Sequence, residues 1–275
     1  MPLLAAARAT LPAGREGALH PFDVAAVRGL AALPAGLAFD RPVTCFVGEN
    51  GSGKSTLLEG LAVAAGLPAV GSEELPRDPT LVPARALARR LRLTWARKAA
   101  RGFFLRAEDF FGFSRRLARE RAEMERRLAE LEDEYAAQDR SAYALRLAQG
   151  PLRSSIAERA RRYGEDLDAR SHGESFLTLF QARLAPDGLF LLDEPESALS
   201  PQRQLALLAM MQDAVARGAQ FVVATHAPIL LAYPGARLYS FDGGGPPRAA
   251  AWEDLEHVQL TRDFLAAPER FLRHL

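Results

Sequence analysis

The sequence predicts an α/β fold in which a largely parallel sheet is interrupted by a helical insertion. From Met1 to about Val70, short apolar runs alternate with Gly and Pro, which is typical of strands and turns. Residues 71–170 are rich in Arg, Ala, Leu and Glu, which indicates helix. From Ser171 onward, apolar runs again alternate with polar segments, as in a sheet with crossover helices. We therefore expect one domain over residues 1–275, with the sheet core in 20–70 and 171–245 and the insertion at about 75–170.

The composition excludes several classes of protein. The chain has 35 Lys and Arg against 34 Asp and Glu, so it is neither a wholly basic nucleic-acid coat nor an acidic solubilising chain. The single cysteine, Cys45, excludes an internal disulfide framework and a clustered cysteine zinc site. The apolar stretch Leu61–Val70 is about half a bilayer span, and the apolar block at the start of the chain is too short for a secretory signal. We expect a soluble, cytoplasmic protein without direct membrane insertion.

The first chemical motif is a glycine loop between a strand and a helix. The β-rich run Val43–Val47 enters GENGSGKST, which has the form G-x-x-x-x-G-K-[ST]. Its glycines allow positive φ, so successive N–H groups face phosphate oxygens, and the following helix N-terminus adds partial positive charge. Lys54 can reach the β- and γ-phosphates of a nucleotide, and the Ser55 hydroxyl is suited to Mg²⁺. The residues expected to bind the phosphates are Gly48, Glu49, Asn50, Gly51, Ser52, Gly53, Lys54, Ser55 and Thr56.

The second motif is a pair of carboxylates at the end of an apolar run. Leu189–Leu192 leads directly into Asp193 and Glu194, which predicts a buried central parallel strand whose carboxyl end meets the ligand. Asp193 would hold the Mg²⁺ hydration shell together with Ser55. Glu194 would point towards the γ-phosphate and orient or deprotonate the attacking water. The alternative is that both carboxylates are solvated turn residues, but the presence of a phosphate loop in the same chain favours the functional interpretation.

These motifs resemble the nucleotide-binding domain of ABC-class P-loop ATPases. The resemblance is carried by GENGSGKST, by LLDEP, by Ser197–Ser200 and by Ala224-Thr225-His226. It is closest to the soluble branch of recombination-repair and chromosome-maintenance ATPases and of stand-alone bacterial AAA-family ATPases. It spans Pro42 to about Pro228 and covers the insertion only loosely. The resemblance implies an ABC-type fold, binding and hydrolysis of ATP with Mg²⁺, and an ATP-dependent homodimer.

A candidate signature loop precedes the acidic strand. Ser171 lies 193 − 171 = 22 residues before Asp193, close to the spacing in the family. Ser171 and Glu174 form an S-x-x-E capping box, so the loop opens a helix and offers an anion site; a plain helix cap is the alternative. The resemblance implies that Ser171, Gly173 and Glu174 contact the γ-phosphate held by a second subunit. His172 stands where a glycine is usual, and Arg170 where a leucine is usual.

Two further segments match the family in part. His226 follows the apolar run Phe221–Ala224, and the resemblance makes it a switch histidine that contacts the γ-phosphate and water, although a histidine at a strand end is often structural. Ser200 stands where the family has an aspartate. The dipeptide Ser200-Pro201 is also a good helix start.

Other features of the family are missing or ambiguous. No glutamine lies between Lys54 and Gln138, so the glutamine loop is absent in recognisable form, and Arg106 or Glu108 is the nearest substitute. This absence argues against a transporter subunit. Phe22 and Phe39 are candidates for stacking on adenine, with core packing as the alternative.

The insertion carries two patterns that bear on partners. Five mostly apolar residues, spaced 7, 4, 3 and 4 positions apart, form a seam along one face of a helix. This seam predicts an amphipathic helix that packs on its own domain or, alternatively, a partner-binding hairpin. The seam consists of Leu117, Met124, Leu128, Leu131 and Tyr135. Residues 79–107 contain many cations and three aromatics but no acidic residue, which suits contact with DNA or RNA or, alternatively, a solvated face. Three roles are compatible with the sequence: an ATP-gated clamp on DNA or RNA, the soluble motor of a membrane transporter, and a scaffold that is switched by ATP without hydrolysing it.

Overall fold

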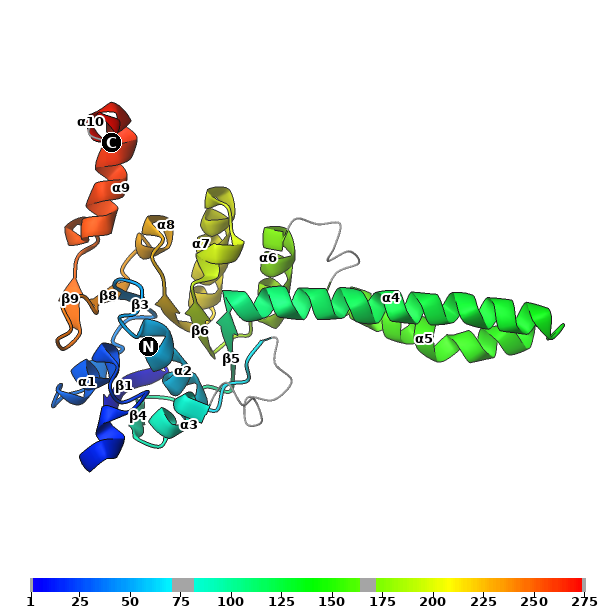
Figure 1. The fold of residues 1–275 in the computed structure, drawn as a ribbon, viewed down its shortest axis with the longest axis horizontal. Helices are drawn as coiled ribbons and strands as arrows, with labels where there is room; N and C mark the ends of the chain where they lie inside the picture. The colour runs from blue at the N-terminus through cyan, green and yellow to red at the C-terminus, as the bar shows by residue number, and fades with distance from the viewer. Residues whose placement is uncertain (1, 71–81, 164–171, 274–275) are drawn as a thin grey trace. The chain divides into compact units, whose positions relative to one another are not determined.

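The computed structural model describes residues 2–70, 82–163 and 172–273 (Figure 1). The chain forms two compact units. An α/β unit comprises Met1–Ala107 and Leu184–Leu275, and a helical unit comprises Glu108–Arg183. None of the helices in the described residues combines the length and apolar composition needed to cross a bilayer.

A six-stranded sheet forms the centre of the α/β unit. Its strand order is β5 (Arg101–Arg106), β6 (Gly188–Asp193), β7 (Gln220–Ala224), β3 (Val43–Val47), β8 (Arg237–Ser240) and β9 (Arg248–Ala250). All neighbouring pairs are parallel except β8 and β9. Every residue of β3, β6 and β7 is buried, because a central parallel strand is covered on both faces. The predicted largely parallel sheet is therefore confirmed.

A smaller antiparallel sheet contains β2 (Leu37–Ala38), β1 (Leu4–Ala9) and β4 (Leu91–Trp95) in that order. Buried Gln220, at the start of β7, links the two sheets. The backbone N–H groups of Leu3 and Leu4 each donate to its Oε1 at 2.8 Å, and its Nε2 donates to the Leu4 carbonyl at 3.0 Å. Satisfying the amide in this way makes its burial tolerable.

Helices flank these sheets in the α/β unit. They are α1 (Ala25–Ala31), α2 (Lys54–Ala64), α3 (Val82–Ala88), α7 (Pro201–Ala216), α8 (Pro228–Leu231), α9 (Glu256–Ala266) and α10 (Pro268–Leu272). Short 3₁₀ turns are η1 (Gly14–Ala18), η3 (Pro195–Ala198) and η4 (Trp252–Asp254). Leu57, Leu58 and Leu61 of α2 are buried in the same apolar cluster as Phe46 of β3. This packing fixes the first turn of α2 beside the end of β3.

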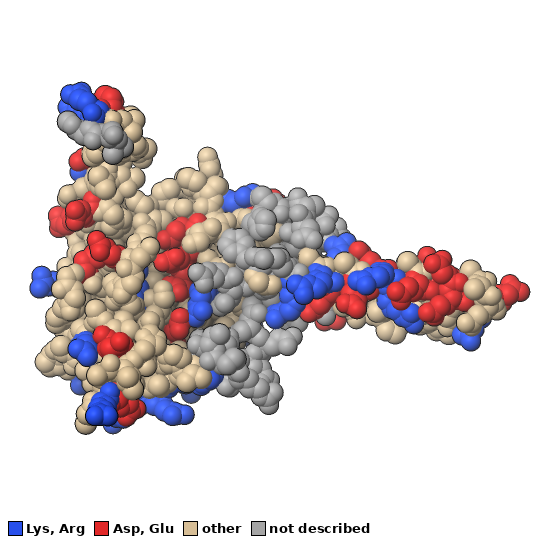
Figure 2. Space-filling model, viewed as in Figure 1, with Lys and Arg blue, Asp and Glu red and all other residues tan. Residues whose placement is uncertain are grey.

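The helical unit contains α4 (Ala107–Ala137), α5 (Ala142–Tyr163) and α6 (His172–Arg183). Helices α4 and α5 form an antiparallel hairpin, in which Gln149 Nε2 donates to Glu132 Oε1 at 2.8 Å. Phe110 of α4 packs edge-on against Phe176 of α6, with ring centroids 5.2 Å apart. Figure 2 shows acidic and basic side chains side by side on the visible face of this hairpin. Pairs such as Arg121 with Glu125, at 2.8 Å, stabilise such exposed helices modestly.

The structure describes four of the five seam residues. Met124, Leu128, Leu131 and Tyr135 are half-buried in α4, whereas the side chain of Leu117 lies outside the described residues. The helix that carries the seam is 31 residues long and is paired with α5. The seam therefore lies in a hairpin within the helical unit, and binding of a partner to this hairpin stays a prediction.

The expected insertion also differs from the observed one. Residues 75–170 were predicted to be mostly helical, but β4 and β5 lie in this range and belong to the α/β unit. In β4, Leu91 is buried and Leu93 and Trp95 are partly buried, while Arg92 and Thr94 are exposed, which is the alternation of a strand with one solvated face. The high Arg and Ala content masked this period of two. The sheets also extend beyond 20–70 and 171–245, to β1 and β9.

Candidate nucleotide site

The glycine loop connects the end of β3 to the first residue of α2. Gly48, Gly51 and Gly53 have φ of 151°, 83° and 91°, as expected for a loop that turns its N–H groups inward. At Gly53 the space also requires glycine, because a Cβ would lie 2.0 Å from Cγ1 of Val24. The loop therefore has the backbone that phosphate binding needs.

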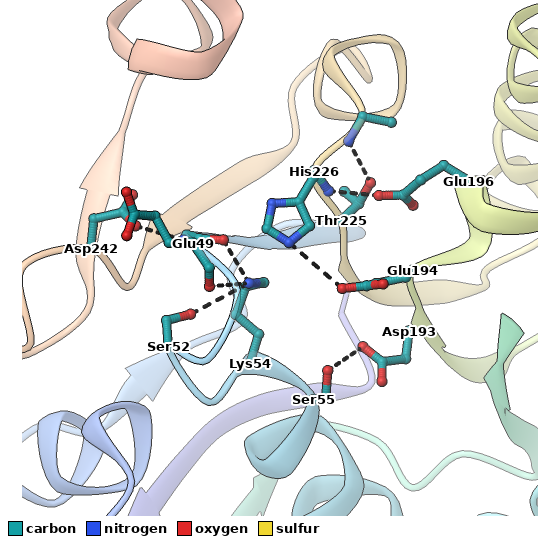
Figure 3. A network of polar contacts seen from close by, with 12 residues as sticks. Glu49, Ser52, Lys54, Ser55, Asp193, Glu194, Glu196, Thr225, His226 and Asp242 are labelled. Atoms are coloured by element: carbon teal, nitrogen blue, oxygen red, sulfur yellow. Dashed lines mark hydrogen bonds and ion pairs between the residues drawn. The ribbon is translucent and has the colours of Figure 1, made fainter. Parts of the chain in front are cut away.

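Lys54 lies at the centre of this loop (Figure 3). Its ammonium donates to the carbonyls of Gly48 at 2.6 Å and Glu49 at 2.9 Å, and the residue is only 4% exposed. Burial lowers the pKa of Lys54, while the nearby carboxylates of Glu194 and Asp193 oppose this shift. The ammonium is thus held by the loop that it would bridge to a phosphate.

Asp193 and Ser55 meet between β6 and α2. The Ser55 hydroxyl donates to Asp193 Oδ1 at 3.0 Å, and Asp193 is 3% exposed. Burial raises the pKa of Asp193 to about 7. A hydroxyl and a carboxylate are the hard oxygen ligands that Mg²⁺ prefers, and a divalent cation would offset the cost of burying this charge. The two residues therefore fit Mg²⁺, although no group of three or more His, Cys, Asp or Glu in the described residues forms a metal site by itself.

Glu194 and His226 lie at the ends of neighbouring strands. Glu194 has a left-handed backbone with φ of 46°, a strained conformation for a non-glycine residue, and its N–H donates to the Ala224 carbonyl at 2.9 Å. Nε2 of His226 is 3.6 Å from Oε1 of Glu194. Burial and the positive charge of Lys54 lower the pKa of His226, so the imidazole is neutral at pH 7 and this contact is not an ion pair. The Glu194 side chain is 41% exposed, which leaves it open to water.

Two carboxylates in this site were not predicted. Oε1 of Glu196 accepts the backbone N–H of His226 at 2.7 Å. Oδ1 of Asp242 accepts the backbone N–H of Glu49 at 2.8 Å, which fixes the phosphate loop from the end of β8. Both residues follow strands that end at this edge of the sheet, and that position is the signal by which the sequence could have indicated them.

The candidate signature loop lies in the helical unit. Ser171 is outside the described residues, and α6 begins directly after it, at His172. Gly173 and Ser175 are buried and Glu174 is exposed. Contact of this segment with a second subunit stays a prediction.

The remaining predicted positions have structural surroundings. Ser200 precedes α7, and its side chain makes no capping hydrogen bond, so the helix start relies on Pro201. Phe22 and Phe39 are 3% and 0% exposed and belong to the apolar core. Neither presents a ring face to an adenine, so the core-packing alternative is correct.

Arg106 ends β5 directly opposite Asp193 in the strand register. Its guanidinium lies 2.6 Å from Oε1 of Glu59 on α2. Arg106, a predicted substitute for the glutamine loop, is therefore paired with Glu59 and lies opposite Asp193, the predicted magnesium ligand. The side chain of Glu108, the other candidate, lies outside the described residues.

The three aromatics of the basic stretch differ in burial, and Trp95 is only partly buried. Phe103 and Phe104 are buried, and Arg97 pairs with Asp187 at 2.5 Å. Further cations of this stretch are exposed, namely Arg89, Arg92, Lys98 and Arg101. Contact with nucleic-acid phosphates needs only such charges, and it stays a prediction.

The fold and the site together define an ABC-like P-loop ATPase, the class that the sequence resembles. The chain belongs to the family described as AAA domain, putative AbiEii toxin, Type IV TA system, whose model matches residues 91–232. A further model, described as AAA domain, matches residues 34–73. No curated protein matches the sequence.

Solved structures with a similar chain course include ABC and Smc proteins. CbiO1 from Clostridium perfringens, part of the ABC transporter complex cbiONQ, has a TM-score of 0.43 and 15% identity, covering 87% of this chain and 90% of that one. The Smc head domain from Pyrococcus furiosus, bound to the C-terminal domain of ScpA, has a TM-score of 0.39 and 13% identity, covering 83% and 94%.

Proposed function

We propose that this protein binds Mg²⁺ and ATP and hydrolyses ATP to ADP and phosphate within a dimer of two copies. The observation that carries the proposal is the arrangement around Lys54. The ammonium is buried in a loop of positive-φ glycines, and Glu194 and His226 end the strands beside it. This combination supplies a phosphate cradle and a base in one site.

Binding would use the backbone first. The N–H groups of residues 48–56 and the N-terminus of α2 would surround the phosphates, and Lys54 would exchange its carbonyl contacts for phosphate oxygens. Ser55 and Asp193 would hold Mg²⁺. When bound, the ion would neutralise negative charge on the β- and γ-phosphates.

Hydrolysis would use Glu194 as the general base. Its carboxylate takes a proton from water while the water oxygen bonds to the γ-phosphorus and the bond from that phosphorus to the β–γ bridging oxygen breaks. Neutral His226 can donate a hydrogen bond to the γ-phosphate or to the water. Glu196 acts as a positioning residue, because it holds the backbone N–H of His226 at 2.7 Å.

The dimer would complete the site. Ser171, Gly173 and Glu174 of a second copy would approach the γ-phosphate, as the signature loop does in the family that the sequence resembles. Helix α6 begins at His172, and Gly173, Ser175 and Phe176 are buried, so the first turn of α6 has a fixed support. A helix start of this kind favours anions.

The test is the substitution Glu194→Gln. Removing the base while keeping the size should lower ATP turnover at least ~100-fold. The affinity for Mg·ATP should stay within about threefold, because the carboxylate is not a phosphate ligand. Steady-state phosphate release and binding of a fluorescent ATP analogue measure the two quantities.

Glu16→Gln, at an exposed glutamate of η1, is the matched control and should change neither quantity. Unchanged turnover in Glu194→Gln would reject the assigned base. Absence of any ATP binding by the wild-type protein would reject the proposed function as a whole.

A further inference from the structure

The C-terminal segment packs against the loop that carries His226. Nε1 of Trp252, in η4, donates to the Pro228 carbonyl at 2.9 Å. Leu255 and Val258 are 5% and 1% exposed, so both sides of the junction between η4 and α9 are anchored in the α/β unit. Because Pro228 is two residues beyond His226, this anchoring brings the start of α9 to the nucleotide site.

His257 lies between these two anchors, in the first turn of α9. Its Nε2 atom is buried and has no hydrogen-bond partner in the part of the chain that the structure describes. Nε2 of His226 has the same property. Buried polar atoms in native proteins are nearly always hydrogen-bonded, so both nitrogens can gain a partner from water or from a ligand bound at the proposed nucleotide site.

The charges around His257 agree with this position. Burial lowers the pKa of His257 first, the electrostatic influence of His226 and Lys54 lowers it further, and Asp242 acts in the opposite direction. Lys54 and Asp242 both contact the phosphate loop, through Gly48 and Glu49. Burial, the largest of these effects, therefore favours a neutral imidazole at His257, and a neutral imidazole carries one N–H donor.

We propose that His257 is a further nucleotide-contacting residue, whose Nε2–H donates a hydrogen bond to the terminal phosphate of bound ATP. The C-terminal segment then closes a side of the site that the phosphate loop and the acidic strand leave open. This inference rests on the proposed function, since it concerns the same triphosphate. It assigns a role in ATP recognition to a part of the chain that lies outside the family motifs.

The test compares ATP with ADP, because only ATP has the terminal phosphate. The full-length protein carries Glu194→Gln throughout, so that ATP persists, and binding of each nucleotide with Mg²⁺ is measured by titration calorimetry. Adding His257→Ala should weaken ATP binding ~10-fold, the loss expected for one hydrogen bond to a charged group, and leave ADP binding within about twofold. His257→Gln keeps a side-chain N–H donor and should recover part of the ATP affinity.

His20→Ala, at an exposed histidine of the same unit, is the control and should leave both affinities unchanged. An ATP affinity that is the same in His257→Ala as in the parent would overturn the inference. An equal fall for both nucleotides would also overturn it, since His257 would then act elsewhere on the ligand or on the fold. If His257→Ala does not fold, the ATP-to-ADP affinity ratio of His257→Gln decides: a fall in this ratio with the ADP affinity unchanged supports the inference, and a ratio unchanged from the parent overturns it. A parent protein that binds neither nucleotide refutes the proposed function, which is a different result.

Discussion

Asp193 and Glu194 are neighbours in sequence with opposite environments. Asp193 is 3% exposed, and burial raises its pKa to about 7. The Glu194 side chain is 41% exposed, on a backbone turned by its positive φ. The buried carboxylate of Asp193 is therefore suited to binding a cation, and the accessible carboxylate of Glu194 is suited to contact with water.

The buried carboxylate makes the stability of the nucleotide-free protein depend on pH. The pKa of Asp193 is raised in the folded state above its ordinary value of 3.8, so the folded state binds more protons between about pH 4 and 7. The contribution of this group to stability is full at low pH and is lost as the pH rises through 7. The loss amounts to at most about 4 kcal/mol.

Asp193→Asn removes this titration and should flatten the pH dependence. In the absence of Mg²⁺ and nucleotide, we expect the variant to be more stable than the wild type at pH 8 by ~1–3 kcal/mol and to match it more closely at pH 4. Urea unfolding at both pH values measures the difference. Asp213→Asn, at an exposed aspartate of α7, is the control, and identical pH slopes for wild type and Asp193→Asn would contradict the prediction.

At the scale of elements, the pairing of β5 with β6 positions Arg106 opposite Asp193. The pairing is close at Gly102, where a Cβ would lie 2.0 Å from the Leu189 carbonyl oxygen and 2.8 Å from Cδ2 of Leu67. A backbone atom cannot move aside as a flexible side chain can. The glycine is therefore required by space, in a strand where glycine is otherwise unfavourable.

Gly102→Ala should separate β5 from β6 and destabilise the protein by ~2–4 kcal/mol, with a loss of ATP turnover because the register beside Asp193 is disturbed. Gly112→Ala is the matched control. Gly112 is exposed in α4, and a Cβ at this position would have no atom within 4 Å, so alanine there should stabilise the helix by up to ~1 kcal/mol. Thermal unfolding of both variants gives the comparison, and similar effects in the two would refute it.

At the scale of the whole molecule, the proposed site needs two chains. The phosphate loop belongs to the α/β unit and the segment after Ser171 to the helical unit. In the proposed dimer each copy supplies the phosphate loop for one ATP and the signature segment for the other. ATP would then join the copies, and hydrolysis would release them.

Glu194→Gln should accumulate this dimer. With Mg·ATP, light scattering after gel filtration should give twice the chain mass of 30.0 kDa, and with ADP it should give the monomer. Lys54→Ala cannot hold the triphosphate and should stay monomeric in both conditions. A single mass for Glu194→Gln with and without ATP would exclude the dimer.

The sequence by itself determined the features that depend on a few consecutive residues. The glycines from Gly48 to Gly53 impose their φ values locally, and the apolar run before Asp193 marks a buried strand wherever it is packed. For that reason the phosphate loop, the acidic strand and the α/β class were predictable. The strands β4 and β5 were not, because the local Arg and Ala content outweighed a short alternation in β4 and a run of three buried apolar residues in β5.

Only the tertiary structure decided which distant groups share the site. Glu196 meets the backbone of His226, 30 residues away, and Asp242 meets Glu49, 193 residues away. The start of α9 comes to the same place because Trp252 and Val258 are anchored on the α/β unit. Contacts at such separations depend on how strands and helices pack, and no local pattern encodes them, since packing is a property of the whole chain.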